Sequence, residues 1–339
     1  MQQTVLITGG AGYIGSHAVK LFLERGLKVV CFDNFSRGWH GAVETLAQST
    51  PKGQLSVVEG DLRRREDIDK VFATYPIDTV LHFAALCSVD ESTREPELYL
   101  SNNVGGSINL FQSMLTHRVK KLIFSSTCAV YNGTTAPMPL TEDITPDPLM
   151  MYGDSKWMIE RAIKWMAQAH DWQYVIFRYF NVCGASSDGS IGDAKKPSVH
   201  LMQNAVRGAM DLEPFYFTFQ PVDTPDGSPI RDYVDVEDLV MAHFQAWEYL
   251  GQGGQSEIFN LGNGTGYSVK QIAEAVEKEF GMSFEKKTDG AKRAGESARA
   301  YADPSKAQKI LGWQPQKSLT DSIQSLRRWY EGHPHGWEW

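Results

Sequence analysis

Residues 5–15 read VLITGGAGYIG, an apolar run followed at once by a row of glycines. Gly9, Gly12 and Gly15 stand three residues apart, and residues 16–23 have the apolar spacing of a helix. A strand, a glycine turn and a helix in this order bring backbone N–H groups to a phosphate at the helix N-terminus. The stretch therefore predicts a dinucleotide-binding unit.

The next apolar run, residues 27–32, ends in Asp33. A carboxylate at the end of this strand is expected to accept hydrogen bonds from the adenosine ribose hydroxyls and to repel a 2′-phosphate. The position of Asp33 thus favours NAD over NADP as the cofactor.

Strand-like and helical runs alternate as far as Asn181. We expect strands at 5–7, 27–32, 55–61, 79–85, 121–126 and 174–178, and helices at 16–23, 42–48, 63–74, 96–117 and 152–170. This alternation predicts an α/β fold with a doubly wound parallel Rossmann sheet in residues 1–181. Residues 182–339, where the alternation is lost, are predicted to form mainly a smaller mixed α/β substrate lobe, with about 234–262 returning to the main sheet.

Composition excludes several classes of protein. The 339 residues carry 33 Lys and Arg against 41 Asp and Glu, a net charge of -8, which argues against nucleic acid as a partner. The apolar runs are too short to span a bilayer. The four scattered cysteines indicate reduced thiols of a cytoplasmic protein, and no histidine spacing suggests a metal site.

A candidate catalytic group begins the helix predicted at 152–170. Tyr152 and Lys156 are four residues apart, which places both side chains on one helical face. A free tyrosine has a pKa of about 10, and a neighbouring lysine charge and a nicotinium ring are both expected to lower it, so that Tyr152 could act as a general base. The strand before this helix ends beside Thr127, whose hydroxyl can hydrogen-bond a substrate oxygen.

These features continue almost end to end, and the chain resembles the UDP-glucose (UDP-galactose) 4-epimerase family of extended short-chain dehydrogenase/reductases. The superfamily motifs are GGAGYIG at 9–15, DN at 33–34, EGDL at 59–62, HFAA at 82–85, NNV at 102–104, SST at 125–127 and YGDSK at 152–156. Segments more specific to the epimerases are RYFN at 178–181, DGSPIRDY at 226–233, FNLG at 259–262 and HPHG at 333–336.

The resemblance implies a tightly held NAD, a UDP-sugar substrate and inversion of the sugar carbon 4 through a transient 4-keto sugar. It implies that Tyr152 is the general base, that Lys156 binds the nicotinamide ribose and that Thr127 holds the 4-oxygen. It implies an NAD site formed by Gly9, Gly12, Tyr13, Ile14, Gly15, Asp33, Asn34, Asp61, Leu62, Phe83, Ala84, Ala85, Asn102, Ser125, Tyr152, Lys156 and Tyr179. It implies a substrate site formed by Thr127, Tyr152, Phe180, Asn181, His200, Leu201, Arg231, Arg293, Glu296 and Ala300.

Three positions depart from or refine the family pattern. Cys87 stands where many members have a lysine that reaches the cofactor phosphates, and His200 stands where many have asparagine. Ala300 occupies the position that sets the room around the sugar 2-substituent. Because alanine is small, we hypothesise that N-acetylhexosamines attached to UDP are also accepted.

The sequence also bears on alternatives to this activity. A UDP-pentose (xylose or arabinose) 4-epimerase stays open, because the sequence does not reveal what fills the site near carbon 6. A sugar-nucleotide dehydratase would need acidic residues after Thr127, where Cys128 and Ala129 stand. A net reductase would not need the epimerase-like diphosphate site, and a non-catalytic NAD-binding sensor would commonly have lost Tyr152 or Lys156. Apolar residues on two faces of the helices at 96–117 and 152–170 indicate burial against the sheet and against either a partner or the second lobe. The family resemblance implies dimerisation through these two helices, so we favour a homodimer.

Overall fold

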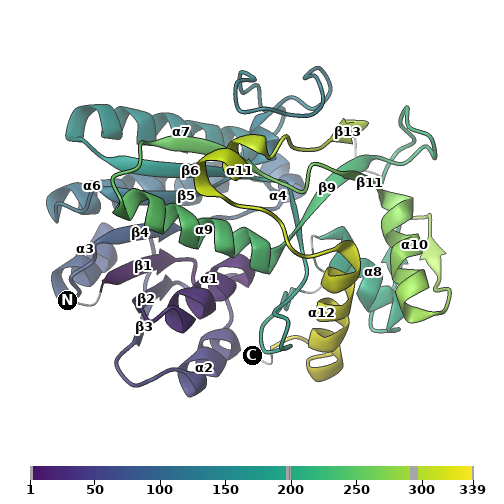
Figure 1. Ribbon diagram of the computed structural model, residues 1–339, viewed down its shortest axis with the longest axis horizontal. Coiled ribbons are helices and arrows are strands. Elements are labelled where there is room, and N and C mark those ends of the chain that lie inside the picture. Colours follow the sequence, from purple (N-terminus) through teal and green to yellow (C-terminus); the bar gives the residue numbers. More distant parts are fainter. Residues whose placement is uncertain (1–2, 196–197, 199, 291–296, 338–339) are drawn as a thin grey trace.

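A seven-stranded parallel sheet forms the centre of the computed structural model, which describes residues 3–195, 198, 200–290 and 297–337 (Figure 1). The strand order is β10-β6-β5-β4-β1-β2-β3, and every neighbouring pair is parallel. The strands are β1 Thr4–Thr8, β2 Lys28–Asp33, β3 Leu55–Glu59, β4 Thr79–His82, β5 Lys121–Thr127, β6 Gln173–Tyr179 and β10 Glu257–Leu261. The predicted Rossmann sheet is confirmed.

The direction of winding reverses between β1 and β4. From β1 the chain builds outward through β2 and β3, and then crosses to β4 on the other side of β1. In such sheets a crevice opens beyond the carboxyl ends of the strands at this reversal, and ligands bind there.

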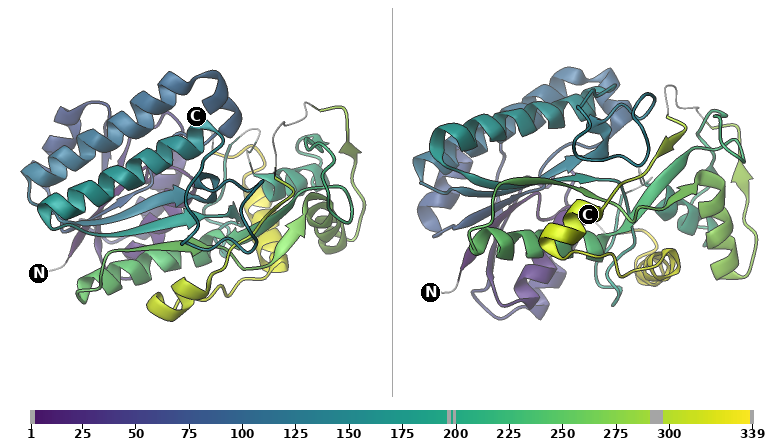
Figure 2. Two further views of the ribbon diagram at one scale, coloured as in Figure 1. Left: turned by 90° about the horizontal axis from the view of Figure 1, so that it is seen from above. Right: turned by 45° about the horizontal axis from the view of Figure 1, so that its top comes forward.

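Helices cover both faces of the sheet (Figures 1 and 2). They are α1 Tyr13–Glu24, α2 His40–Ser49, α3 Arg65–Thr74, α4 Val89–Arg94, α5 Pro96–Tyr99, α6 Gly106–Thr116, α7 Met151–His170, α9 Val236–Gly251 and α11 Ser305–Leu311. Successive side chains of a strand point to opposite faces of the sheet, so alternate strand residues enter two separate cores. The core with α3, α6 and α7 takes Leu6, Val30, Leu122 and Ile176. The core with α1, α2 and α9 takes Val5, Val29, Ile123 and Val175.

The single helix expected at 96–117 is divided into three parts. Between α5 and α6, residues Leu100–Gly105 form a π-helical turn. This wider turn is a feature that apolar spacing does not reveal. It carries Asn102 and Asn103, and the buried Asn103 side chain accepts from Leu86 N at 2.9 Å and donates to Leu86 O at 3.0 Å. The turn therefore fixes the loop that follows β4.

The second half of the chain adds a smaller lobe beside the carboxyl edge of the sheet (Figure 1). Its four-stranded sheet combines β7 Asn181–Cys183, β9 Ile230–Asp235, β11 Gly266–Ser268 and β13 Arg299–Ala300, and β8 Phe215–Tyr216 pairs separately with β12 Lys286–Lys287. Its helices are α8 Leu201–Ala209, α10 Val269–Phe280 and α12 Leu319–Gly332. These helices enclose a core that includes Met202, Ile272 and Trp329.

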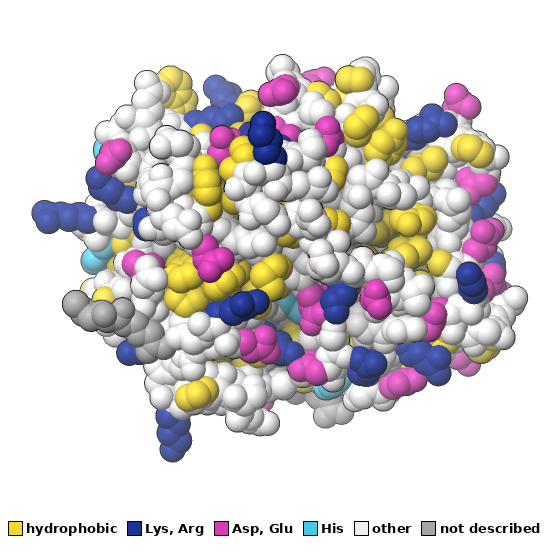
Figure 3. Space-filling view, viewed as in Figure 1, with side chains coloured by type: hydrophobic (Ala, Val, Ile, Leu, Met, Phe, Trp, Pro, Cys, Tyr) yellow, Lys and Arg dark blue, Asp and Glu magenta, His cyan; other side chains and the backbone are white. Residues whose placement is uncertain are grey.

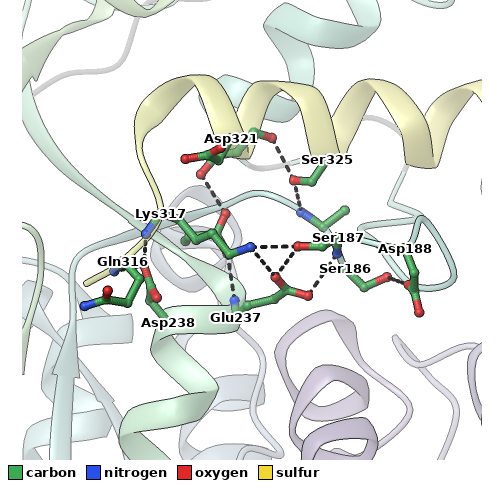
Figure 4. Close-up of polar contacts among 12 residues, drawn as sticks. Ser186, Ser187, Asp188, Glu237, Asp238, Gln316, Lys317, Asp321 and Ser325 are labelled. Atoms are coloured by element: carbon green, nitrogen blue, oxygen red, sulfur yellow. Dashed lines mark hydrogen bonds and ion pairs between the residues drawn. The ribbon is translucent and has the colours of Figure 1, made fainter. Parts of the chain in front are cut away.

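A network of polar side chains joins the lobe to α9, which packs on the main sheet (Figure 4). Lys317 Nζ donates to Ser187 Oγ at 2.8 Å and lies 3.0 Å from Glu237 Oε2. Glu237 also accepts from the Ser187 backbone N–H at 2.9 Å, and Asp238 accepts from the Lys317 backbone N–H at 2.8 Å. Since these charges are paired with one another, we regard the network as an anchor between the lobe and the sheet.

Charge is mixed on the surface. Figure 3 shows acidic and basic side chains interspersed over the face that it views. Among the described residues, no helix is long and apolar enough to cross a membrane.

Candidate active site

A cavity of about 1340 Å³ lies at the carboxyl edge of the main sheet and extends under the lobe. Most of the residues selected from the sequence line it. They are Gly9, Gly12, Tyr13, Ile14, Gly15, Asp33, Asn34, Asp61, Leu62, Phe83, Ala84, Ala85, Asn102, Ser125, Thr127, Tyr152, Lys156, Tyr179, Phe180, Asn181, His200, Arg231 and Ala300. Leu201 does not line it and packs instead on the lobe core. Arg293 and Glu296 lie outside the described residues.

The glycine loop is shaped by close approach to the loop that follows β4. Gly9 has a φ of +71°, and a Cβ there would lie 2.6 Å from the backbone N of Ala84. A Cβ on Gly15 would collide with the carbonyl oxygen of Gly9. Only glycine fits both positions, so the loop is free to present its backbone to a ligand.

Two carboxylates follow the loop along the cavity. Asp33 Oδ2 accepts from Ala11 N at 3.0 Å, which ties the end of β2 to the glycine loop. Burial raises the pKa of Asp33 above its ordinary value. Arg63 Nη2 donates to Asp61 Oδ2 at 2.6 Å, and this pairing lowers the pKa of Asp61 to about 2. Asp61 therefore stays ionised at neutral pH. The carboxylate oxygens of Asp33 can accept hydrogen bonds from the hydroxyl groups of a ligand.

The candidate catalytic group lies at the tip of β5. The Thr127 side chain hydrogen-bonds Tyr152, and both line the cavity. Lys156 Nζ donates to the backbone oxygen of Ser125 at 2.7 Å, and burial lowers its pKa to about 8. The structure thus brings together the three side chains that the sequence selected.

The expected lowering of the Tyr152 pKa is not produced by the chain's own groups. Burial raises this pKa, the nearby Cys87 adds to the increase, and the Thr127 hydrogen bond offsets only part of it. The expectation rested on the charges of Lys156 and of a nicotinium ring, but the lysine is directed to a backbone carbonyl rather than to the phenol.

The lobe supplies the other wall of the cavity. Arg231 on β9 donates to Ser297 O at 3.0 Å, and its register partner on β13 is Ala300. The His200 ring tilts against Tyr13 with centroids 5.6 Å apart, and burial lowers the His200 pKa to about 4. His200 is therefore neutral at pH 7 and packs against the first residue of α1.

Sequence reasoning missed several residues that line the cavity. They are Arg37, Trp39, Lys195, His335 and Trp337. His335 lies within the HPHG segment, to which the sequence assigned no role. The others carry no periodic signal, because they reach the cavity from loops and from the end of the chain.

Comparison with known proteins assigns the chain to a family. The family model described as "NAD dependent epimerase/dehydratase family" matches residues 5–262. The chain belongs to this family. The resemblance to UDP-glucose 4-epimerases, drawn from motifs, is confirmed by full-length relatives.

Among its relatives, this epimerase/dehydratase is 40% identical over 335 residues to a "UDP-glucose 4-epimerase" of Halalkalibacterium halodurans, covering 98% of this chain and 97% of the relative. It is 38% identical over 344 residues to "Probable UDP-arabinose 4-epimerase 3" of Arabidopsis thaliana, covering 98% of this chain and 82% of that protein. The crystal structure of UDP-glucose 4-epimerase from Bifidobacterium longum in complex with NAD+ and UDP superposes with a TM-score of 0.93 at 34% identity, covering 99% of this chain and 100% of that one.

The residues present suit a dinucleotide. The cavity is lined by Gly9, Gly12 and Gly15, whose loop packs so closely on the Ala84 backbone that a Cβ at Gly9 is excluded, and by the Asp33 carboxylate at the end of β2. Its volume of about 1340 Å³ exceeds the ~300–1,000 Å³ of a typical single-ligand pocket. The site of this family member therefore has room for a dinucleotide and a second ligand together.

Proposed function

We propose that this protein is an NAD-dependent 4-epimerase of UDP-sugars. The observation that carries the proposal is the meeting of Tyr152, Lys156 and Thr127 inside one cavity with the glycine loop. When bound, NAD supplies a hydride acceptor that later returns the hydride. We propose that residues 1–181 bind the cofactor and that residues 182–339 mainly bind the sugar nucleotide.

The cofactor would be held by the chain as follows. Backbone N–H groups of the loop at 9–15 would face the diphosphate, and Asp33 would accept hydrogen bonds from the adenosine ribose. Lys156, already directed to the tip of β5, would bind the nicotinamide ribose. Lys156 keeps its charge below about pH 8, so it remains a cation under neutral conditions.

Side chains at the same carboxyl end of β5 would carry out the chemistry on the substrate. Tyr152 would remove the proton of the sugar 4-hydroxyl, and Thr127, which already hydrogen-bonds Tyr152, would hold the 4-oxygen. Arg231 would pair with the diphosphate, since a guanidinium can bind two oxygens at once. The 4-keto sugar would turn about its diphosphate link, and Tyr152 would return the proton to the inverted product.

The direct test uses purified protein with UDP-galactose and no added NAD. We expect conversion to UDP-glucose without net NADH, because a resident cofactor is regenerated in each cycle. Protein that carries NAD but converts neither this substrate nor the pentose and N-acetyl sugars would contradict the proposal.

A second candidate function is UDP-pentose 4-epimerisation. It is favoured by the Arabidopsis thaliana relative named as a UDP-arabinose 4-epimerase, which matches 98% of this chain. The same assay with UDP-xylose separates the two candidates. A turnover of UDP-xylose well above that of UDP-galactose would make the pentose the principal substrate.

We also propose that UDP-N-acetylhexosamines are accepted. Ala300 lines the cavity on β13 opposite Arg231, and its small side chain leaves room beside the sugar 2-substituent. Ala300→Tyr is expected to reduce turnover of UDP-N-acetylgalactosamine by roughly tenfold or more, since overfilling a packed site typically costs about 1–3 kcal/mol. UDP-galactose turnover should change less. Equal turnover of the acetylated sugar in both proteins would remove Ala300 from this role.

We further propose a homodimer formed through α6 and α7, which lie side by side on one outer face (Figures 1 and 2). Trp165 on α7 is 65% exposed and Leu115 on α6 is 41% exposed, an unusual exposure for such apolar side chains. Trp165→Glu is expected to shift the mass measured by light scattering from dimer to monomer. Met282→Glu, at an exposed apolar residue of the lobe, is the matched control and should leave the mass unchanged.

A cytoplasmic location is also proposed. All four cysteines are free, and Cys31 and Cys183 are buried in the cores. Unpaired buried thiols are typical of reducing compartments.

A further inference from the structure

Lys195 reaches across the cavity from the lobe to the main sheet. Its Nζ lies 3.7 Å from Sγ of Cys87, which belongs to the loop after β4. That loop includes Ala84, whose backbone abuts Gly9 of the glycine loop. The Lys195 ammonium therefore stands at the edge of the cavity where the glycine loop offers its N–H groups.

The ammonium has a weak partner there. A thiol is a weak hydrogen-bond acceptor, and among the described residues no ion pair joins Lys195 to a carboxylate. Nearby Asp193 accepts from Ser198 Oγ at 2.5 Å and from the Lys195 backbone N–H at 3.2 Å. Arg37, another cation that lines the cavity, is paired with Glu91 at 2.6 Å. Lys195 thus has no carboxylate within ion-pair distance among the described residues, and its ammonium can pair with an anion that enters the cavity.

The C-terminal turn holds the segment that carries Lys195. Gly336 has a φ of +70°, and a Cβ there would lie 2.8 Å from the backbone oxygen of Ala194. The turn is itself anchored by aromatic contacts, because the His333 ring stacks on Trp329 with centroids 3.8 Å apart and lies 4.7 Å from the Trp337 ring. Backbone contact at Gly336 therefore limits where Ala194, and with it Lys195, can lie.

We propose that Lys195 binds the diphosphate of the cofactor from the lobe side and that the turn at Gly336 positions it. This inference rests on the proposed use of NAD. The cofactor diphosphate is favoured over that of the sugar nucleotide because Cys87 belongs to the loop whose Ala84 backbone abuts Gly9, whereas Arg231 lies on β9 of the lobe sheet. Cofactor retention would then require the lobe and the sheet to be docked together.

The test measures exchange of bound NAD for labelled NAD in the full-length holoenzyme, with no sugar nucleotide present. Lys195→Gln is expected to accelerate release about 10- to 100-fold, the range for loss of a hydrogen bond to a charged group. Lys195→Arg should restore most of the retention. Lys164→Gln is the matched control, because Lys164 lies on α7 over the Trp157 ring and does not line the cavity.

Two results would overturn the inference. One is NAD release from Lys195→Gln at the wild-type rate, and weaker binding of UDP to that holoenzyme would then assign Lys195 to the substrate. The other is an equal acceleration of NAD release by Lys164→Gln. Wild-type protein that binds no NAD even when NAD is added would instead refute the proposed function, so the two failures are distinguishable.

The positioning role of Gly336 is tested by a double-mutant cycle. Gly336→Ala displaces the backbone at Ala194 and is expected to accelerate NAD release severalfold in the wild-type background. If it acts through the lysine, it should add little when Lys195→Gln is already present. Full additivity of the two effects would show that the turn does not position Lys195. If Lys195→Gln fails to fold, Gly336→Ala alone still tests the inference, because NAD release from it at the wild-type rate would contradict the positioning of Lys195 by the turn.

Discussion

Tyr152→Phe is expected to lower kcat for UDP-galactose by roughly 10²–10⁴-fold, the usual contribution of general acid–base catalysis. The substitution removes only the hydroxyl that hydrogen-bonds Thr127, and the ring keeps its edge-to-face contact with Tyr99 at 6.5 Å. The fold and the bound NAD should therefore be retained. Steady-state turnover, together with the NAD content of the purified variant, measures both expectations.

A matched control separates catalysis from packing. Tyr174 lies near the start of β6, at the opposite end of the strand from Tyr179, and it does not line the cavity. Tyr174→Phe removes the same group and should leave kcat unchanged. If folded, NAD-loaded Tyr152→Phe turns over at the wild-type rate, Tyr152 is not the general base.

The parts of this molecule that the sequence predicts are those encoded by local spacing. The glycine loop, Asp33 and the Tyr152–Lys156 pair each depend on neighbours within a single strand, turn or helix. Successive side chains of a strand point to opposite faces of a sheet, and apolar residues on both faces predict a sheet that is covered on both sides. Val29 and Val30 accordingly enter opposite cores. These local features made the Rossmann fold predictable from the sequence, together with most of the selected residues that line the cavity.

What the sequence does not predict depends on long-range contacts. Lys195 meets Cys87 across 108 positions of the chain, and Trp337 meets Gly41 from the opposite end. No periodicity marks such pairs. The pKa of Tyr152 is a related case, because its direction depends on how deeply the folded chain buries the phenol. Spacing alone showed a lysine nearby but not that this lysine bonds to Ser125.

A buried ion pair supports the strand tip that carries Thr127. The Arg178 and Glu160 side chains are 2% and 0% exposed and join through two hydrogen bonds of 3.0 and 2.7 Å. Ser126 donates to Glu160 at 2.6 Å, and Arg178 donates to the Tyr131 hydroxyl at 2.8 Å. The pair thus connects β5, β6 and α7 directly behind the candidate catalytic group.

Arg178→Met is expected to reduce the free energy of unfolding by about 3–5 kcal/mol, because it leaves the Glu160 carboxylate buried without its partner. Chemical denaturation, with the slope checked for constancy, measures this loss. Adding Glu160→Met should cost little more, or recover part of the loss, because the second change removes the stranded charge.

An exposed ion pair provides the comparison. Arg327 and Glu331 on α12 are 2.9 Å apart with side chains 45% and 54% exposed, so Arg327→Met should cost less than about 1 kcal/mol. Two results would contradict this explanation. One is a loss of unfolding free energy in Arg178→Met as small as that in Arg327→Met. The other is a loss in the double variant that equals the sum of the losses in Arg178→Met and Glu160→Met. The buried pair would then stabilise the strand tip through shape alone, since an uncompensated charge at Glu160 would have carried no penalty.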